Sequence, residues 1–172
     1  MGKLQILVGD ITSDEILEGH DCIVNPTNPR MVCGSGVSGA IFHKAGVNKL
    51  ENYTQNRYDI SYDINDNLMK IGDIRITPGF DLGMDIVFVQ GPTVWDYNAE
   101  ESLFDVYRKM LEAINEKGYK NILLPSLGTG HYGFDPKDIG KKVKYILSEF
   151  VKDKDVNIDL VLFIPEDKKY YI

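Results

Sequence analysis

The chain has 172 residues, of which 43% are hydrophobic and 26% are charged, a balance typical of a globular protein with a core of its own. Its formal net charge of -7 argues against a general nucleic-acid binder or membrane-surface binder, because such proteins need a basic footprint. A small anionic ligand remains compatible with this charge, since backbone amides in one pocket bind anions whatever the net charge.

The chain begins with an apolar run that predicts a buried strand. Residues 4–9 are rich in β-formers and lead into an aspartate. Thr12 or Ser13 then opens a short helix that stops at Gly19, because either hydroxyl can accept hydrogen bonds from the free N–H groups of a first helical turn.

Residues 24–41 form the segment around which the chain is organised. An apolar strand, residues 22–24, leads into a loop with two asparagines, two prolines and three glycines, and a helix is predicted over residues 37–45 with Gly46 as its C-terminal cap. Glycines let a ligand approach the backbone, and the start of the following helix favours negative charge. The segment suits an anion-binding loop, although glycine-rich turns of this kind also occur for packing reasons.

No regular element is predicted for residues 48–70, where asparagines break any apolar period. The irregularity of this segment is the sole basis for the hypothesis that it forms a lid facing the substrate. Residues 72–77 alternate and precede a Pro-Gly turn, which predicts a strand, and residues 86–90 predict a more continuous strand.

An amphipathic helix follows. Asn98 is expected to cap it, Glu101 to complete a capping box, and Gly118 to end it. Residues 122–124 form a fully apolar strand, the kind that a parallel sheet covered on both faces requires. A second glycine-rich loop occupies residues 125–134.

The last elements complete an alternation of strands and helices. Asp135 and Pro136 open a helix, with proline in its favoured first position, and residues 160–164 are the last strand. This order predicts an α/β fold with helices on both sides of the sheet. Both glycine loops follow strands and precede helices, so both should lie at the carboxyl edge of the sheet, where open α/β folds bind ligands.

Five sets of residues carry motifs in a familiar order: 9–12; 23–28 with 34–41; 72–80; 91–92; and 124–125 with 128–134. Together they resemble the macrodomains, which bind ADP-ribose, and the resemblance covers most of the chain. It implies one macrodomain over residues 1–172, with a three-layer α/β/α fold around a central mixed, mostly parallel sheet.

The resemblance also implies roles for matching residues. Asp10 would accept a hydrogen bond from the adenine amino group, and Ile11 would donate its backbone N–H to the ring. Backbone amides of both glycine loops would wrap the diphosphate. The implied ligand-binding residues are Asp10, Ile11, Asn25, Gly34, Ser35, Gly36, Val37, Ser38, Ser126, Gly128, Thr129, Gly130, His131 and Tyr132.

At the distal ribose, the resemblance implies that Tyr132 packs on the sugar and that Asn28 hydrogen-bonds its hydroxyls as the catalytic residue. Plainer alternatives stay open, because Asp10 could be only a helix-proximal cap and Asn28 could only stabilise a turn. The apolar platform for adenine is open between Pro165 and a C-terminal tyrosine such as Tyr170.

Many hydrolytic macrodomains carry an aspartate at the position of Ser38, and a serine cannot act as a carboxylate base at neutral pH. Other members with a small residue there are hydrolases, in which a water near the diphosphate attacks the anomeric carbon. We expect an ADP-ribosyl hydrolase acting on a modified protein, a modified nucleic acid or acetylated ADP-ribose. The alternatives are a non-catalytic reader of ADP-ribose or its adducts and, more remotely, a domain for another nucleotide.

The remaining expectations concern cysteines, metals and location. Cys22 is expected in the core, and Cys33 lies beside a glycine loop without a histidine poised to activate it. The three histidines have no ligand-like spacing with the cysteines, so we expect neither a metal nor a cofactor. The apolar run in residues 1–8 is too short for a signal peptide and no later stretch could span a bilayer, which predicts a cytoplasmic protein with no membrane partner. Two cysteines in a chain of this length do not make a disulfide scaffold, so we expect reduced thiols. We also expect a monomer.

Overall fold

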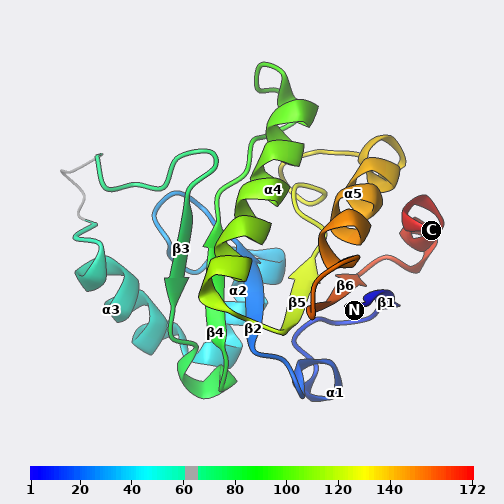
Figure 1. Ribbon diagram of the computed structural model, residues 1–172. Helices are drawn as coiled ribbons and strands as arrows, with labels where there is room; N and C mark the ends of the chain where they lie inside the picture. Colours follow the sequence, from blue (N-terminus) through cyan, green and yellow to red (C-terminus); the bar gives the residue numbers. More distant parts are fainter. Residues whose placement is uncertain (61–65) are drawn as a thin grey trace.

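The computed structural model of the protein describes residues 1–60 and 66–172 and contains one six-stranded sheet (Figure 1). The strand order is β1-β6-β5-β2-β4-β3, in which every neighbouring pair is parallel except β4 and β3. The predicted mixed, mostly parallel sheet is therefore confirmed. The strands are β1 (Leu4–Val8), β2 (Cys22–Pro26), β3 (Ile74–Thr77), β4 (Asp85–Val89), β5 (Asn121–Pro125) and β6 (Asn157–Leu162).

Helices cover both faces of the sheet, which confirms the three-layer α/β/α arrangement. In Figure 1, α4 and α5 lie in front of the sheet and α2 lies behind it. The helices are α1 (Asp14–Leu17), α2 (Gly36–Ala45), α3 (Val47–Arg57), α4 (Ala99–Lys117) and α5 (Pro136–Val151), with 3-10 turns η1 (Phe80–Leu82) and η2 (Pro165–Tyr171).

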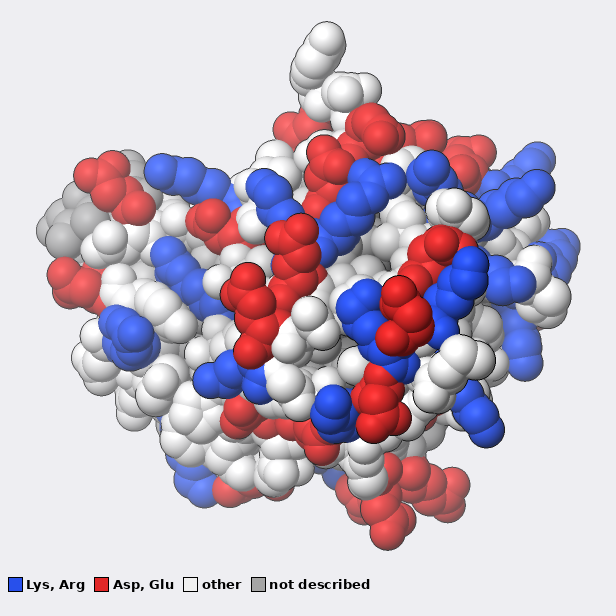
Figure 2. Space-filling view, viewed as in Figure 1, with Lys and Arg blue, Asp and Glu red and all other residues white. Residues whose placement is uncertain are grey.

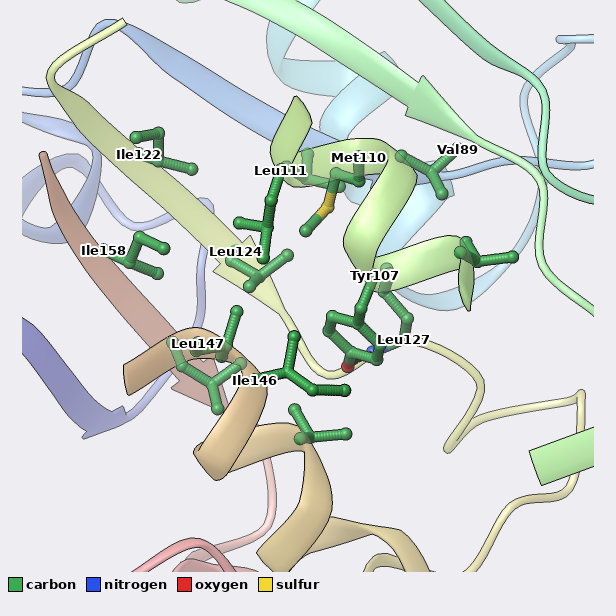
Figure 3. Close-up of a cluster of buried hydrophobic side chains, with 14 of the residues drawn as sticks. Val89, Tyr107, Met110, Leu111, Ile122, Leu124, Leu127, Ile146, Leu147 and Ile158 are labelled. Atoms are coloured by element: carbon green, nitrogen blue, oxygen red, sulfur yellow. Dashed lines mark hydrogen bonds between the residues drawn. The ribbon is translucent and has the colours of Figure 1, made fainter. Parts of the chain in front are cut away.

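The central strands bury both of their faces, and this explains why they read as unbroken apolar runs. In β5, Ile122 and Leu124 pack into the core beneath α4 and α5, whereas Leu123 points into the core beneath α2. Figure 3 shows the first of these cores, where α4 places Tyr107 and Met110 against the sheet.

One contact in this core anchors the second glycine-rich loop. The backbone N–H of Leu127 donates to the hydroxyl of Tyr107 over 2.8 Å (Figure 3). Tyr107 is fully buried, and its burial raises the pKa of the phenol. It therefore stays a neutral hydroxyl that fixes the start of the loop to α4.

The sequence analysis left one helix unassigned and was wrong about the caps of two others. Val47–Arg57 forms the helix α3, where no regular element was predicted. Ser13 precedes α1, but its hydroxyl does not cap the helix, and the Thr12 hydroxyl donates to Asp10 instead. Asn98 does precede α4, but its backbone is left-handed with φ of 53° and its side chain does not cap the helix, so there is no capping box. The hypothesis of a lid within residues 48–70 rests partly on residues 61–65, which lie outside the described residues.

No helix in the described part of the chain is long and apolar enough to cross a membrane. Figure 2 shows lysines and arginines interleaved with acidic side chains over α4 and α5, not gathered into one basic patch. This agrees with the net negative charge of the chain.

Candidate functional site

The two glycine-rich loops meet at the carboxyl edge of the sheet, as predicted. The first loop follows β2 and leads into α2, and the second follows β5 and leads into α5. The hydroxyl Oγ of Ser35 in the first loop lies 2.8 Å from Nε2 of His131 in the second, a hydrogen-bond distance. The sheet thus brings together two segments that lie 96 residues apart in the chain.

The first loop presents free backbone amides. Because α2 begins at Gly36, the N–H groups of Gly36, Val37 and Ser38 have no acceptor within their own helix. Ser35 occupies the N-cap position, but its hydroxyl faces His131 and leaves these amides uncapped. The partial positive charge of the helix N-terminus adds to their preference for an anion.

Glycine is required at two positions at the start of α2. Gly36 has φ of 60°, the left-handed region that side chains rarely adopt. Gly39 is buried, and a Cβ atom there would lie 2.4 Å from the backbone oxygen of Gly34 in the first loop. The helix can approach the loop this closely only because residue 39 has no side chain.

The second loop is held by its own backbone and by Tyr132. Gly128 has φ of 82° and accepts from the N–H of Phe134 over 2.9 Å. The Tyr132 hydroxyl accepts from Nε2 of Gln90 over 3.0 Å and donates to the backbone oxygen of Thr27 over 3.4 Å. Tyr132 therefore links the second loop to the ends of β2 and β4.

Other predicted residues of the second loop have structural partners. The Ser126 hydroxyl lies 2.6 Å from the hydroxyl of Tyr171 in η2, and the Thr129 hydroxyl donates to the backbone oxygen of Ser126 over 3.4 Å. Gly130 is exposed, with open space where a side chain would stand. The exposed backbone around Gly130 is the part of this loop that a ligand can approach.

Two buried polar side chains beside the first loop lack partners among the described residues. Asn25 at the end of β2 is 0% exposed, and neither its amide nitrogen nor its oxygen has a hydrogen-bond partner there. The hydroxyl of Ser38, 7% exposed in the first turn of α2, is unpaired in the same sense. Leaving such groups unpaired costs about 1–3 kcal/mol each, so both favour a polar group supplied from outside the chain.

Asn28 is committed to the loop itself. Its Nδ2 donates to the backbone oxygen of Val32 over 2.8 Å, and its Oδ1 accepts from the N–H of Val32 over 3.2 Å. Asn28 therefore stabilises a turn, as the plainer interpretation predicted. The amide retains one further N–H and one lone pair for another partner.

Asp10 and Ile11 lie at the opposite end of the edge, after β1. The N–H and the hydroxyl of Thr12 both donate to Oδ1 of Asp10, over 2.9 and 2.7 Å. These hydrogen bonds lower the pKa of the Asp10 carboxyl, which is exposed and keeps Oδ2 available. Ile11 is buried beneath this turn.

The sequence analysis missed Phe163, a candidate apolar surface near Asp10. Phe163 follows β6 and is 78% exposed, and β6 pairs with β1 up to the bond from the Gly9 N–H to the Leu162 oxygen. Tyr170 instead packs against the core beneath α4 and α5. Phe163 directly follows the apolar strand β6, and this position at the carboxyl edge of the sheet is the signal that could have identified it.

The surroundings of the two cysteines disfavour a reactive thiolate. Burial and the carboxylate of Glu51 raise the pKa of the Cys33 thiol, which disfavours the thiolate needed for nucleophilic attack. Cys22 is buried in the core, as expected. Across residues 1–60 and 66–172, no group of three or more His, Cys, Asp or Glu side chains is arranged to hold a metal ion.

Comparison with known proteins supports one family. The family model described as Macro domain matches residues 24–142. An O-acetyl-ADP-ribose deacetylase of Cronobacter sakazakii is 32% identical over 148 residues, which span 84% of this chain and 76% of that protein. Another, from an Enterobacter species, is 30% identical over 171 residues, spanning 97% of this chain and 88% of that protein.

The fold has close matches among solved structures. The Oceanobacillus iheyensis macrodomain with ADP superposes with a TM-score of 0.84 at 31% identity, over 98% of this chain and 87% of that one. A mutant of the same macrodomain with ADPR gives a TM-score of 0.79 at 31% identity, over 98% and 89%.

Proposed function

Because this chain belongs to the Macro domain family, we propose that it binds ADP-ribose along the carboxyl edge of its sheet. The diphosphate would lie between the two glycine loops, the adenine at the β1 and β6 end, and the distal ribose at the β2 and β4 end. We further propose that residues 1–172 form one macrodomain, a monomer that acts in the cytoplasm without cofactor or metal. Size-exclusion chromatography tests whether the protein is a monomer, and cell fractionation tests whether it is cytoplasmic.

The observation that carries the proposal is the set of free amides at the start of α2, facing a second loop that Ser35 and His131 join to the first. A diphosphate supplies acceptors for these N–H groups and negative charge for the helix N-terminus. The glycine at 130 lets the second loop approach the same phosphates without a side chain between.

At the adenine end, Asp10 would accept from the exocyclic amino group through its free Oδ2. Its lowered pKa keeps the carboxyl ionised, which is the form that accepts. Ile11 would donate its backbone N–H to the ring, and Phe163 would offer the face on which the base stacks.

At the distal ribose, the proposal extends to hydrolysis, since relatives 30–32% identical are named O-acetyl-ADP-ribose deacetylases. For a substrate whose acceptor carboxylate is esterified at the anomeric carbon, a water would add to that carbon while the bond to the carboxylate breaks. The carboxylate leaves as an anion and the second proton of the water passes to solvent. Asn28 would hold the ribose with its remaining hydrogen-bonding capacity, and Tyr132 would pack beside it.

Because Ser38 stands where an acid could act as a base, the proposed catalysis would depend on positioning the water and the ribose. Its hydroxyl does not take up a proton at neutral pH, so it cannot replace a carboxylate base, but it can orient a water or ribose hydroxyl. The absence of an acid at this position favours a second candidate function, a reader that binds ADP-ribose or its adducts without chemistry.

Calorimetric titration with ADP-ribose tests the binding proposal. The wild type should bind, and Asp10→Ala should bind at least tenfold more weakly. Asp153→Ala, which removes an exposed carboxylate just after the C-terminal end of α5, should bind as the wild type does. No binding by the wild type would refute the proposal. Titration with AMP tests the remaining nucleotide alternative, which equal affinity for AMP would favour.

An assay for the release of ADP-ribose from modified substrates distinguishes a hydrolase from a non-catalytic reader. The assay uses a modified protein, a modified nucleic acid and O-acetyl-ADP-ribose, each with wild type and Asn28→Ala. Turnover above the buffer rate that falls in the variant supports the hydrolase. Binding without turnover of all three substrates supports the reader, and unchanged turnover in Asn28→Ala removes Asn28 from the mechanism.

A further inference from the structure

The loop at residues 93–98, which we call the aromatic loop, follows β4 and is fixed to the second glycine loop. The N–H of Val94 donates to the backbone oxygen of Tyr132 over 2.8 Å. A Cβ atom at Gly133 would lie 3.2 Å from the ring of Trp95, so this ring lies over the second glycine loop. Oδ2 of Asp96 accepts from the N–H and hydroxyl of Thr93, which holds the turn.

The aromatic loop exposes two large rings. Trp95 is 78% exposed and Tyr97 is 97% exposed, so the Tyr97 ring contributes almost nothing to the core. Figure 2 shows uncharged side chains standing clear of the surface above α4, with acidic side chains around their base. Two large exposed rings on one short loop make this loop a candidate interaction site.

The loop is also acidic. Residues 91–104 contain Asp96, Glu100 and Glu101 but neither lysine nor arginine. Glu100 and Glu101 lie in the first turn of α4, where their negative charge interacts favourably with the positive end of the helix dipole and can also attract cations. This stretch of the chain therefore contributes three carboxylates and no basic side chain to the surroundings of the two rings.

The strand order indicates which part of a bound ligand would lie beside the aromatic loop. Asp10 lies at the β1 and β6 end of the sheet, and the aromatic loop lies beyond β4, at the other end. If ADP-ribose lies along the edge as proposed above, any group attached to its distal ribose leaves the site beside residues 93–98. The present inference rests on that proposed function.

We propose that the aromatic loop binds the acceptor side of the substrate and that the acceptor is a protein segment bearing lysine or arginine near the modified residue. Trp95 and Tyr97 bind such cations through cation–π contacts, and the surrounding carboxylates attract them. The same carboxylates repel nucleic-acid phosphates, so the loop selects a cationic peptide over a nucleic acid.

The test compares three ligands: free ADP-ribose, a peptide carrying ADP-ribose through a non-hydrolysable linkage with three lysines or arginines nearby, and the same peptide with those residues replaced by glutamine. The wild type should bind the cationic peptide about tenfold more tightly than the neutral one, since two exposed cation–π contacts contribute about 2- to 5-fold each. The preference should fall with rising salt.

Tyr97→Ala and Trp95→Ala should each reduce this preference while leaving the affinity for free ADP-ribose within about twofold. Tyr145→Ala is the matched control, because Tyr145 is a 59% exposed ring on α5 away from the loop. Trp95 is the only tryptophan, so its fluorescence gives a second readout, which should change more with the cationic peptide than with the neutral peptide.

The outcomes separate this inference from the proposed function. Binding of ADP-ribose with equal affinity for the two peptides overturns the acceptor inference alone, as does a preference that survives in both loop variants. Tighter binding of a single-stranded oligonucleotide carrying ADP-ribose than of the cationic peptide also overturns it. Failure to bind ADP-ribose overturns both.

Discussion

Replacing Gly39 by alanine tests how closely α2 must approach the first glycine loop. Helix propensity alone predicts a gain of about 1 kcal/mol, because glycine is a poor residue for a helix interior. The added Cβ would lie 2.4 Å from the backbone oxygen of Gly34, so helix and loop must separate by about 1 Å. Overpacking of this kind costs about 1–3 kcal/mol, and contact with backbone puts the cost in the upper part of that range.

We therefore expect Gly39→Ala to lose about 1–2 kcal/mol of stability, which for a chain of this size lowers Tm by about 2–8 °C. Because the loop moves with Gly34, the variant should also bind ADP-ribose more weakly. Thermal denaturation followed by circular dichroism gives the first quantity and calorimetric titration the second.

Gly130→Ala is the matched control, since a Cβ atom there meets nothing within 4 Å and its φ is not left-handed. It should change stability by less than about 0.5 kcal/mol, but it should weaken ADP-ribose binding by placing a methyl group on the proposed diphosphate surface. A Gly39→Ala protein as stable as the wild type, with unchanged binding, would refute the reasoning about close approach.

Three further predictions follow from single contacts. Asn28→Ala should lose about 1–3 kcal/mol in urea unfolding, because both backbone groups of Val32 lose their partner; an unchanged midpoint would contradict this. The pKa of Asp10 is lower in the folded protein than in the unfolded chain, so its stabilising contribution is present above the unfolded pKa and is lost as pH falls through the folded pKa. Between pH 5 and about pH 2, the Tm of the wild type should therefore fall more than the Tm of Asp10→Asn. Equal decreases in Tm would contradict this prediction. Phe163→Ala should leave Tm unchanged and weaken ADP-ribose binding about 5- to 100-fold, the range for loss of a base stacked on an aromatic ring, and equal affinity would remove Phe163 from the adenine end.

The strands and the position of the site were readable from the sequence because burial on both faces leaves a signal in consecutive residues. Residues 86–89 and 122–125 are apolar or proline throughout, and the structure buries all of them. The two glycine loops follow β2 and β5, which are neighbouring parallel strands, so both lie at the carboxyl edge of the sheet. The meeting of Ser35 and His131 is the direct consequence.

Helix α3 was missed because Leu50 is the one apolar side chain that it buries, while polar side chains attach it to the first glycine loop. Glu51 accepts from the N–H of Cys33 over 2.8 Å, and the Thr54 hydroxyl donates to the backbone oxygen of Met31 over 2.9 Å. Gln55 Nε2 donates to the backbone oxygen of residue 30 over 2.9 Å. A helix that holds a loop by hydrogen bonds needs no apolar stripe, so the pattern that identifies most helices is absent here.

These contacts also bear on how the proposed site would work. The backbone of residues 30–33 is held from one side by α3 and from the other by the paired hydrogen bonds between Asn28 and Val32. A loop fixed in this way loses little conformational entropy when a ligand binds. It leads directly into the start of α2 at Gly36, where the amides proposed for the diphosphate lie. Ser38 provides no base, and an accurately held ribose and water are then the means left to these residues for lowering the barrier. The side chains that hold the loop without touching the ligand are therefore as necessary to the proposed activity as those that face it.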